Sequence, residues 1–204
     1  MYNHERTIKS ISNTSITMPI CNIHLWDSFY KYLNTRELSG TLARLNQWYP
    51  SSSAGDAIPR IVIPAYNTAK SIFWQARAMV EAEKRYQSPH GTRNDSLIVV
   101  SPYGGTPRFS LICEGPMDAL AGAMLGARSI ALMGNTPPES VLDLTRTLVR
   151  GTLPLIVLAD NDDPGSLSLI LGHVSQVASS MLLLPPAGYK DLAACPISLR
   201  KALF

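Results

Sequence analysis

Length, composition and charge already exclude several classes of protein. The chain has 204 residues, of which 46% are hydrophobic and 16% charged, and its formal net charge is +3. That is enough for a sizeable core in one large domain or two small ones. No apolar run approaches the roughly 18 residues of a membrane helix, and the polar start 1–6 lacks the apolar core of a signal peptide. We therefore expect an intracellular, cytoplasmic protein that does not contact a membrane.

The cysteines argue against two further classes. Cys21, Cys113 and Cys195 lie far apart and form no CxxC pair and no Cys/His set at zinc spacing. We expect neither a disulfide framework nor a bound zinc ion.

The chain opens with a polar segment that precedes two short helices. Residues 1–25 are rich in Asn, Ser and Thr and lack a sustained apolar period, so we expect a flexible N-terminal arm. From 25 to 48 the apolar residues recur at helical spacing. This pattern predicts two short helices with a break near Ser39.

The next part of the chain predicts a hairpin and a further strand. Residues 61–67 and 70–77 are apolar segments that we expect to pair around a turn at Asn67, and a third strand is expected at 97–100. We interpret residues 26–107 as one small mixed α/β subdomain.

The second half alternates between strands and helices, and we interpret it as a separate unit, 108–204. Each helix has one apolar face, and Gly126 stands where the first helix should end. The strands are expected at 110–114, 129–133, 154–159 and 181–184. Strands joined by helices form right-handed crossovers, so we expect a parallel sheet flanked by helices, which is an α/β fold.

Basic residues are concentrated in the middle of the chain. Residues 60–93 hold six basic residues and two acidic ones, whereas residues 94–204 hold seven basic and nine acidic. A basic segment beside an acidic one suits a polymer of phosphates, although a solvated basic face explains the charge equally well. The six basic residues are Arg60, Lys70, Arg77, Lys84, Arg85 and Arg93.

Carboxylates follow two of the predicted strands. Glu114 ends one strand, and Asp160 and Asp162 follow another. The carboxyl ends of parallel strands face the ligand crevice, so we expect these groups to converge. Clustered carboxylates repel one another unless a hard cation neutralises them. The sequence therefore predicts an Mg²⁺ (or Mn²⁺) site, which points to phosphate chemistry.

These two segments resemble a known pair of motifs. Residues 114–119 (Glu-Gly-Pro-Met-Asp-Ala) and 160–165 (Asp-Asn-Asp-Asp-Pro-Gly) resemble the glutamate and DxD motifs of the Toprim domain. Their form is that of the catalytic core of DnaG-type primases of bacteria and phages. Upstream segments in the same order as in those primases extend the resemblance over about residues 26–195: they are 32–39, 60–64, 73–77 and 85–89.

The resemblance implies a fold, an activity and partners. It implies a Toprim domain at 108–204, preceded by a primase-like subdomain at 26–107 that carries a basic template groove. The activity would be synthesis of RNA primers from NTPs on a single-stranded DNA template. Replication proteins such as a replicative helicase would be its partners, and the chain would be of phage or plasmid type.

The same resemblance assigns roles to the carboxylates. Glu114 would be the acid or base linked to the metal, and Asp160 and Asp162 would ligate the metal, so that all three are catalytic. Asp118, one helical turn after Glu114, and Asp163 are expected to support the ligands from behind. Asp163 is expected to do so as the N-cap of a helix starting at Pro164.

A further set of residues is expected to hold nucleic acid and nucleotides. Arg77 and the Arg85-Tyr86 pair match family positions, and Lys84 stands where the family has a lysine. The family has another lysine after the Ser-Pro stretch, where this chain offers Arg93. The full set is Arg60, Arg77, Lys84, Arg85, Tyr86, Arg93 and Lys190.

Two other functions stay open at this point. A Toprim nuclease of the OLD type or of the ribonuclease type would use similar carboxylates to cut nucleic acid. A protein that retained the fold but lost the chemistry would bind nucleic acid without turnover.

Overall fold

The computed structural model describes residues 16–67, 72–89, 96–104, 106–134, 136–149, 154–163, 165 and 168–204. The predicted site residue Arg93 lies outside these ranges, as do residues 1–15 of the predicted arm and the predicted turn after Asn67.

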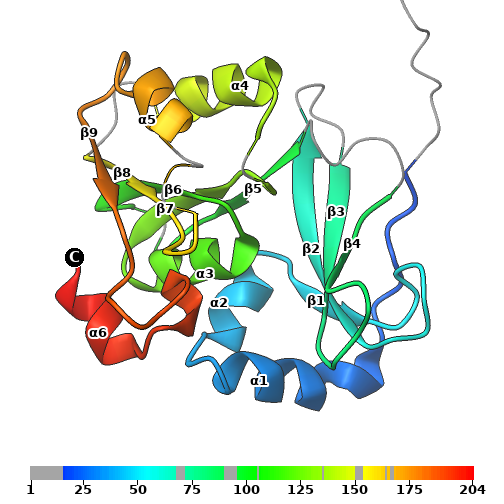
Figure 1. Cartoon of the computed structure of the whole chain (residues 1–204). Coiled ribbons are helices and arrows are strands. Elements are labelled where there is room, and N and C mark those ends of the chain that lie inside the picture. The colour runs from blue at the N-terminus through cyan, green and yellow to red at the C-terminus, as the bar shows by residue number, and fades with distance from the viewer. Residues whose placement is uncertain are drawn as a thin grey trace, which may run out of the picture.

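Helices cover both faces of one mixed sheet (Figure 1). The helices are α1 (Trp26–Asn34), α2 (Gly40–Leu45), α3 (Pro116–Met124), α4 (Glu139–Val149), α5 (Ser168–Val174) and α6 (Ile197–Ala202), with the 3-10 turns η1 (Ile23–Leu25) and η3 (Leu192–Ala194). The strands are β1 (Tyr49–Ser51), β2 (Arg60–Asn67), β3 (Ile72–Ala78), β4 (Tyr86–Gln87), β5 (Ser96–Val100), β6 (Phe109–Cys113), β7 (Ala127–Ala131), β8 (Leu155–Leu158) and β9 (Ser180–Leu183). The nine strands found in the described ranges have the order β4-β3-β2-β5-β7-β6-β8-β9, and β1 pairs with β2.

The predicted hairpin is confirmed. Strands β2 and β3 pair antiparallel from Arg60 opposite Ala78 to Tyr66 opposite Ile72. Strand β4 then adds to the free edge of β3, with Tyr86 opposite Arg77. Helices α1 and α2 cover one face of this hairpin. Their apolar side chains recur at helical spacing and pack against those of β2.

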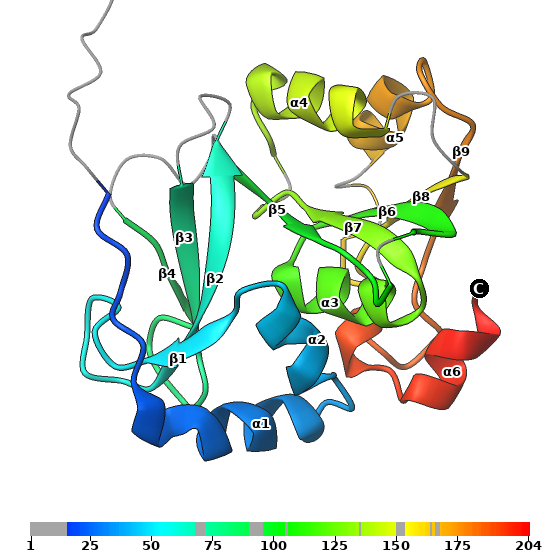
Figure 2. The same cartoon turned by 180° about the vertical axis from the view of Figure 1, so that it is seen from behind.

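The parallel α/β prediction is confirmed for the second half. Strands β7, β6, β8 and β9 run parallel in that order. Helix α3 covers one face, and α4 and α5 cover the other (Figures 1 and 2). Gly122 lets α3 approach the sheet closely, since a Cβ there would collide with Leu111 on β6.

Some predicted boundaries are shifted. Strand β7 begins at Ala127, two residues before the predicted start, because Gly126 ends the preceding turn with φ +94°. Helix α5 begins at Ser168. Residues 164, 166 and 167 lie outside the described ranges, so the supporting role of Asp163 as a helix cap stays a prediction.

Strand β5 joins the two halves into one sheet. It pairs antiparallel with β2 through Leu97 opposite Tyr66, and with β7 through Ile98 opposite Ala131. One hydrophobic core also contains residues of both halves. The division at 107/108 remains a prediction, and the sheet passes across it.

The C-terminal segment is attached to the α1–α2 loop by a buried arginine. The Arg200 side chain is 1% exposed. Its guanidinium donates to the carbonyls of Glu37 (3.0 Å), Arg36 (2.6 Å), Leu192 (3.0 Å) and Ala193 (3.0 Å). Arg200 thereby ties η3 to helices that are far away in the sequence.

Among the described residues, we find no helix that combines the length and apolar character needed to span a membrane.

Replacing Arg200 tests this attachment. Arg200→Met leaves two buried and two partly buried carbonyls without their charged donor, so we expect the free energy of unfolding to fall by about 3 kcal/mol or more. Lys201→Met, at an exposed neighbouring position, should change it by less than about 0.5 kcal/mol. Urea denaturation followed by circular dichroism measures both, and equal stabilities would show that the attachment contributes nothing.

Candidate functional site

A cleft with a volume of ≈ 350 Å³ contains both acidic and basic side chains. It lies where the carboxyl ends of β6 and β8 face β3, β4 and η3. Strand β3 brings Arg77, and the ends of β6 and β8 bring Glu114 and Asp160. The lining residues are Arg36, Arg77, Arg85, Tyr86, Glu114, Gly115, Met117, Asp118, Asp160, Lys190, Asp191 and Ala194.

The carboxylates of the cleft repel one another. Burial, together with the nearby charges of Glu114 and Asp191, raises the pKa of Asp160 to about 6, against the opposing effect of Lys190. Burial, together with Asp191, also raises the pKa of Asp118. Asp118 Oδ1 accepts a hydrogen bond from the Ala193 N–H (2.9 Å), which connects α3 to η3. Burial and mutual repulsion therefore disfavour the charged forms of Asp160 and Asp118 in the cleft.

Two tyrosines hold Arg77 in place. Arg77 Nε donates to Tyr32 Oη (2.8 Å) and Arg77 Nη1 donates to Tyr86 Oη (2.7 Å). The guanidinium also lies 4.8 Å from the centre of the Tyr86 ring, within the range of cation–π attraction. Burial raises the pKa of Tyr86 to about 12, so its phenol stays protonated. Arg77 is thus fixed in position where it meets the cleft.

Arg36 and Arg85 add positive charge beside Arg77. The Arg36 guanidinium lies 5.4 Å from the centre of the Tyr32 ring. Arg85 is exposed to solvent. Both line the same cleft as the carboxylates.

Asn161 holds the loop that carries Lys190. Its side-chain amide donates to the carbonyls of Pro185 (3.0 Å) and Tyr189 (2.6 Å), and its backbone N–H donates to the Lys190 carbonyl (2.8 Å). Lys190 in turn forms an ion pair with Asp162. That hydrogen bond to Lys190 lowers the pKa of Asp162. The carboxylate of Asp162 is therefore turned toward a lysine at an exposed position.

Seven of the predicted site residues share the cleft. They are Arg77, Arg85, Tyr86, Glu114, Asp118, Asp160 and Lys190. Asp162 and Asp163 are exposed and do not line it. Lys84 is also exposed, and its backbone carbonyl accepts a hydrogen bond from Arg60.

Arg60 is placed differently from its predicted role. Its side chain is 0% exposed, and Nε and Nη2 donate to the two carboxylate oxygens of Asp56 (2.9 and 2.8 Å). It also donates to the carbonyls of Lys84 and Arg85. A buried arginine paired in this way positions the β3–β4 loop and is not available to nucleic acid. The structure therefore corrects the predicted contact between Arg60 and nucleic acid.

Sequence reasoning did not assign three residues of this region. Arg36 and Asp191 line the cleft, and Asn161 holds its Lys190 loop. Arg36 lies in a segment whose resemblance to primases was recognised, and Asp191 follows Lys190 directly. The Lys190-Asp191 pair is a two-residue signal at most, and only the fold brings Arg36 and Asp191 to the cleft.

The predicted metal ligands do not form a compact triad. Within the described part of the chain, one set of three potential ligands has its ligand atoms within 4.8 Å of one another, and it consists of Glu139, Asp143 and His173. These residues belong to α4 and α5, on the opposite face of the sheet from α3 (Figure 1).

Comparison with known proteins identifies the fold. No family model and no curated protein matches the sequence. A crystal structure of the Aquifex aeolicus primase, described as its zinc binding and RNA polymerase domains, is similar with a TM-score of 0.56 and 16% sequence identity. The match covers 80% of this chain and 50% of that one, so this chain matches about half the length of the primase chain. The likeness shows a primase-like α/β fold, and it does not show a Toprim domain.

The same comparison corrects the cofactor prediction, which was Mg²⁺ or Mn²⁺ and no zinc. The similar primase structure includes a zinc binding domain by its own description, so the exclusion of zinc no longer stands. Cysteine spacing detects only zinc motifs that are local in sequence. Ligands that the fold brings together from distant helices give no such signal.

Burial and repulsion in the cleft together predict a pH-dependent gain in stability for Asp160→Asn. Because the pKa of Asp160 is higher in the folded chain than its ordinary value of 3.8, folding disfavours the ionised form. The cost grows as pH rises from about 4 to 6 and is constant above. After screening at this half-buried site, we expect Asp160→Asn to raise the free energy of unfolding on the order of 1 kcal/mol at pH 7.5.

That gain should disappear below about pH 4, where the carboxyl is protonated in both states. Urea denaturation in EDTA at the two pH values measures it. Asp27→Asn, at an exposed position on α1 outside the cleft, is the matched control. A stability loss at pH 7.5 would contradict this view of the cleft's charges.

Proposed function

We propose that the cleft catalyses nucleotidyl transfer, making short RNA primers from NTPs on a single-stranded DNA template. One observation carries the proposal: arginines of the hairpin and carboxylates of the parallel sheet line the same cleft. Phosphate-binding groups beside cation-binding groups are what phosphoryl transfer requires. The primase-like fold supports the same choice.

In this proposal the basic residues bind phosphates. Arg77, held by two tyrosines, and the exposed Arg85 would contact the template backbone or the triphosphate, and Arg36 would add a third charge. Because the tyrosines fix Arg77 before a ligand binds, little side-chain entropy is lost when it contacts a phosphate. Residues 26–107 would form the template-holding part of the chain.

Glu114 and Asp160 would hold a divalent cation. Their carboxylate oxygens suit a hard cation, and a cation would relieve the repulsion that contributes to the raised pKa of Asp160. Such a cation neutralises charge on the triphosphate when it is bound. Asp162 would become a further ligand once Lys190 breaks its ion pair with Asp162 and contacts a substrate phosphate. Residues 108–204 would act as a Toprim-like catalytic part.

Partners follow from the same chemistry. A replicative helicase or another replication protein would supply the single-stranded template to the cleft. The chain would then meet DNA, NTPs and a replication partner at one face.

Incubation with single-stranded DNA, labelled NTPs and a divalent cation tests the proposal. Mg²⁺, Mn²⁺ and Zn²⁺ are supplied in separate reactions, and products are resolved on a denaturing gel. We expect short RNA products, and Glu114→Gln and Asp160→Asn should lower their yield by about 100-fold or more. Asp27→Asn, at an exposed carboxylate outside the cleft, should retain activity. Shortened DNA would instead support a nuclease, and full activity in both cleft variants would rule out this site.

Binding of single-stranded DNA tests the role of the arginines separately. Arg85→Ala should weaken binding to all sequences and flatten the dependence of log K on log salt by about 0.7, the value for one phosphate contact. Arg77→Ala should have a similar effect. Without a divalent cation, Asp160→Asn should bind at least as tightly as the wild type, since it removes negative charge from the cleft.

Fluorescence anisotropy from low to moderate salt measures these affinities. Arg44→Ala, at an exposed arginine that does not line the cleft, is the control and should keep the wild-type slope. If Arg44→Ala changes the slope and Arg85→Ala does not, nucleic acid binds elsewhere.

A further inference from the structure

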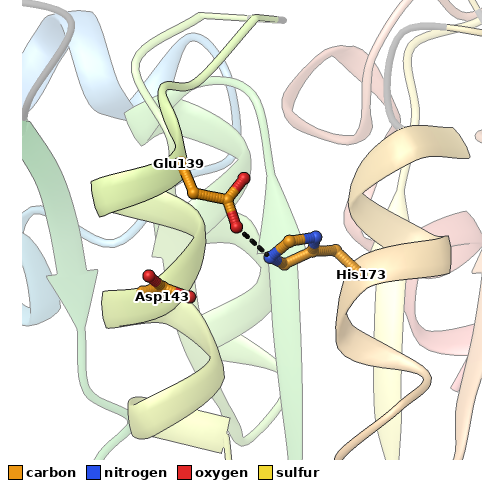
Figure 3. Close-up of side chains that lie close together, drawn as sticks. All are labelled: Glu139, Asp143 and His173. Carbon is orange, nitrogen blue, oxygen red and sulfur yellow. Dashed lines mark ion pairs between the residues drawn. The ribbon is translucent and has the colours of Figure 1, made fainter. Parts of the chain in front are cut away.

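Three potential metal ligands meet between α4 and α5, outside the cleft. Glu139 and Asp143 lie one turn apart on α4, and His173 approaches them from α5 (Figure 3). His173 Nε2 lies 3.3 Å from Glu139 Oε1. All three ligand atoms lie within 4.8 Å of one another.

The imidazole nitrogen that faces this cluster is buried. His173 Nε2 is enclosed, and no hydrogen-bond partner for it is found in the described parts of the chain. Its contact with Glu139 is an ion pair only when the imidazole is protonated. A buried nitrogen without a hydrogen bond is costly, and a metal ion that takes its lone pair would remove that cost.

We propose that α4 and α5 together bind a Zn²⁺ ion through the carboxylates of Glu139 and Asp143 and through His173 Nε2. A set of two oxygens and one imidazole nitrogen suits zinc better than Mg²⁺, which prefers oxygen ligands and retains its waters. Zinc bonds of about 2.0–2.1 Å put two ligands of a tetrahedron about 3.3–3.4 Å apart. The spacing of His173 and Glu139 already matches that edge.

The two carboxylates are free to complete such a site. Their side chains are 69% and 60% exposed, for Glu139 and Asp143 respectively, so a small rotation brings their oxygens to the imidazole without moving the core. Three protein ligands leave one tetrahedral position for water. The ion would pin α5 to α4 over the sheet face that these helices cover, and the site does not depend on the function proposed for the cleft.

Arg146 competes with the ion for Asp143. Arg146 Nη1 lies 3.2 Å from Asp143 Oδ1, and its other nitrogens donate to the His173 carbonyl (3.4 Å) and to Gln176 Oε1 (2.5 Å). A bound dication would displace only the Asp143 contact. Removing the positive charge of Arg146 should therefore tighten metal binding. If the cluster were only a set of ion pairs, removing that charge could only weaken it.

Isothermal titration of EDTA-treated, dialysed full-length protein with Zn²⁺ tests the proposal. The Asp160→Asn variant is the background, so that the cleft contributes little. We expect about one Zn²⁺ per chain, with affinity reduced by more than about tenfold in Asp143→Asn and in His173→Ala. Arg146→Gln should bind more tightly. His24→Ala and Asp27→Asn, at exposed positions on η1 and α1, are matched controls and should bind as the background does.

Co²⁺ serves as a spectroscopic probe of the same site. The visible absorption of a tetrahedral nitrogen and oxygen site should appear in the background protein and vanish in Asp143→Asn, without the thiolate band that binding at Cys21 would give. If His173→Ala does not fold, Glu139→Gln replaces it at an exposed position. Unchanged Zn²⁺ affinity in Asp143→Asn and Glu139→Gln, or the absence of binding in the background, would show that the cluster is only an interhelical ion pair.

Discussion

The antiparallel ladder between β5 and its two neighbours determines how the hairpin meets the parallel strands. Backbone hydrogen bonds in a sheet allow little sliding, because a shift of one residue turns every side chain to the other face. Strand β5 pairs with β2 at Tyr66 and with β7 at Ala131. This register carries the far edge of the hairpin, with Arg77 and Tyr86, to the side of the molecule where β6 and β8 end.

The cleft places arginine side chains close to carboxylates. The guanidinium of Arg77 donates to two neutral phenols, and no ion pair between Arg77 and a carboxylate is found among the described residues. Burial and the nearby charges of Glu114 and Asp191 together raise the pKa of Asp160. Lys190 and Asp162 form the one direct pair of opposite charges described at the rim. A site lined by groups of both signs is suited to a ligand that carries phosphate and a cation together.

The sequence predicted those features that have a local cause. An apolar strand followed by an acid and a helix start is visible within a dozen residues, so the parallel strands and the positions of Glu114 and Asp160 could be predicted. Charge counted over a segment could not distinguish Arg85, which is exposed, from Arg60, whose guanidinium is buried against Asp56. The direction of a guanidinium depends on packing that no segment average contains.

Contacts between distant segments set the remaining features. The orientation of Asp162 depends on Lys190, whose loop is held by Asn161. The meeting of His173 with Glu139 depends on how α5 packs on α4. The same limit applies to zinc, because ligands from separate helices have no characteristic spacing in the sequence. Cysteine spacing alone therefore could not exclude a zinc site.

The central claim is that basic and acidic residues of the cleft act on one ligand. A crystal structure of the protein with a nucleoside triphosphate and a divalent cation tests this most directly. The account predicts phosphate oxygens within hydrogen-bonding distance of Arg85 or Arg77, with the cation bound between the phosphates and the carboxylates of Glu114 and Asp160. A nucleotide bound elsewhere, with these four side chains contacting neither phosphate nor cation, would contradict it.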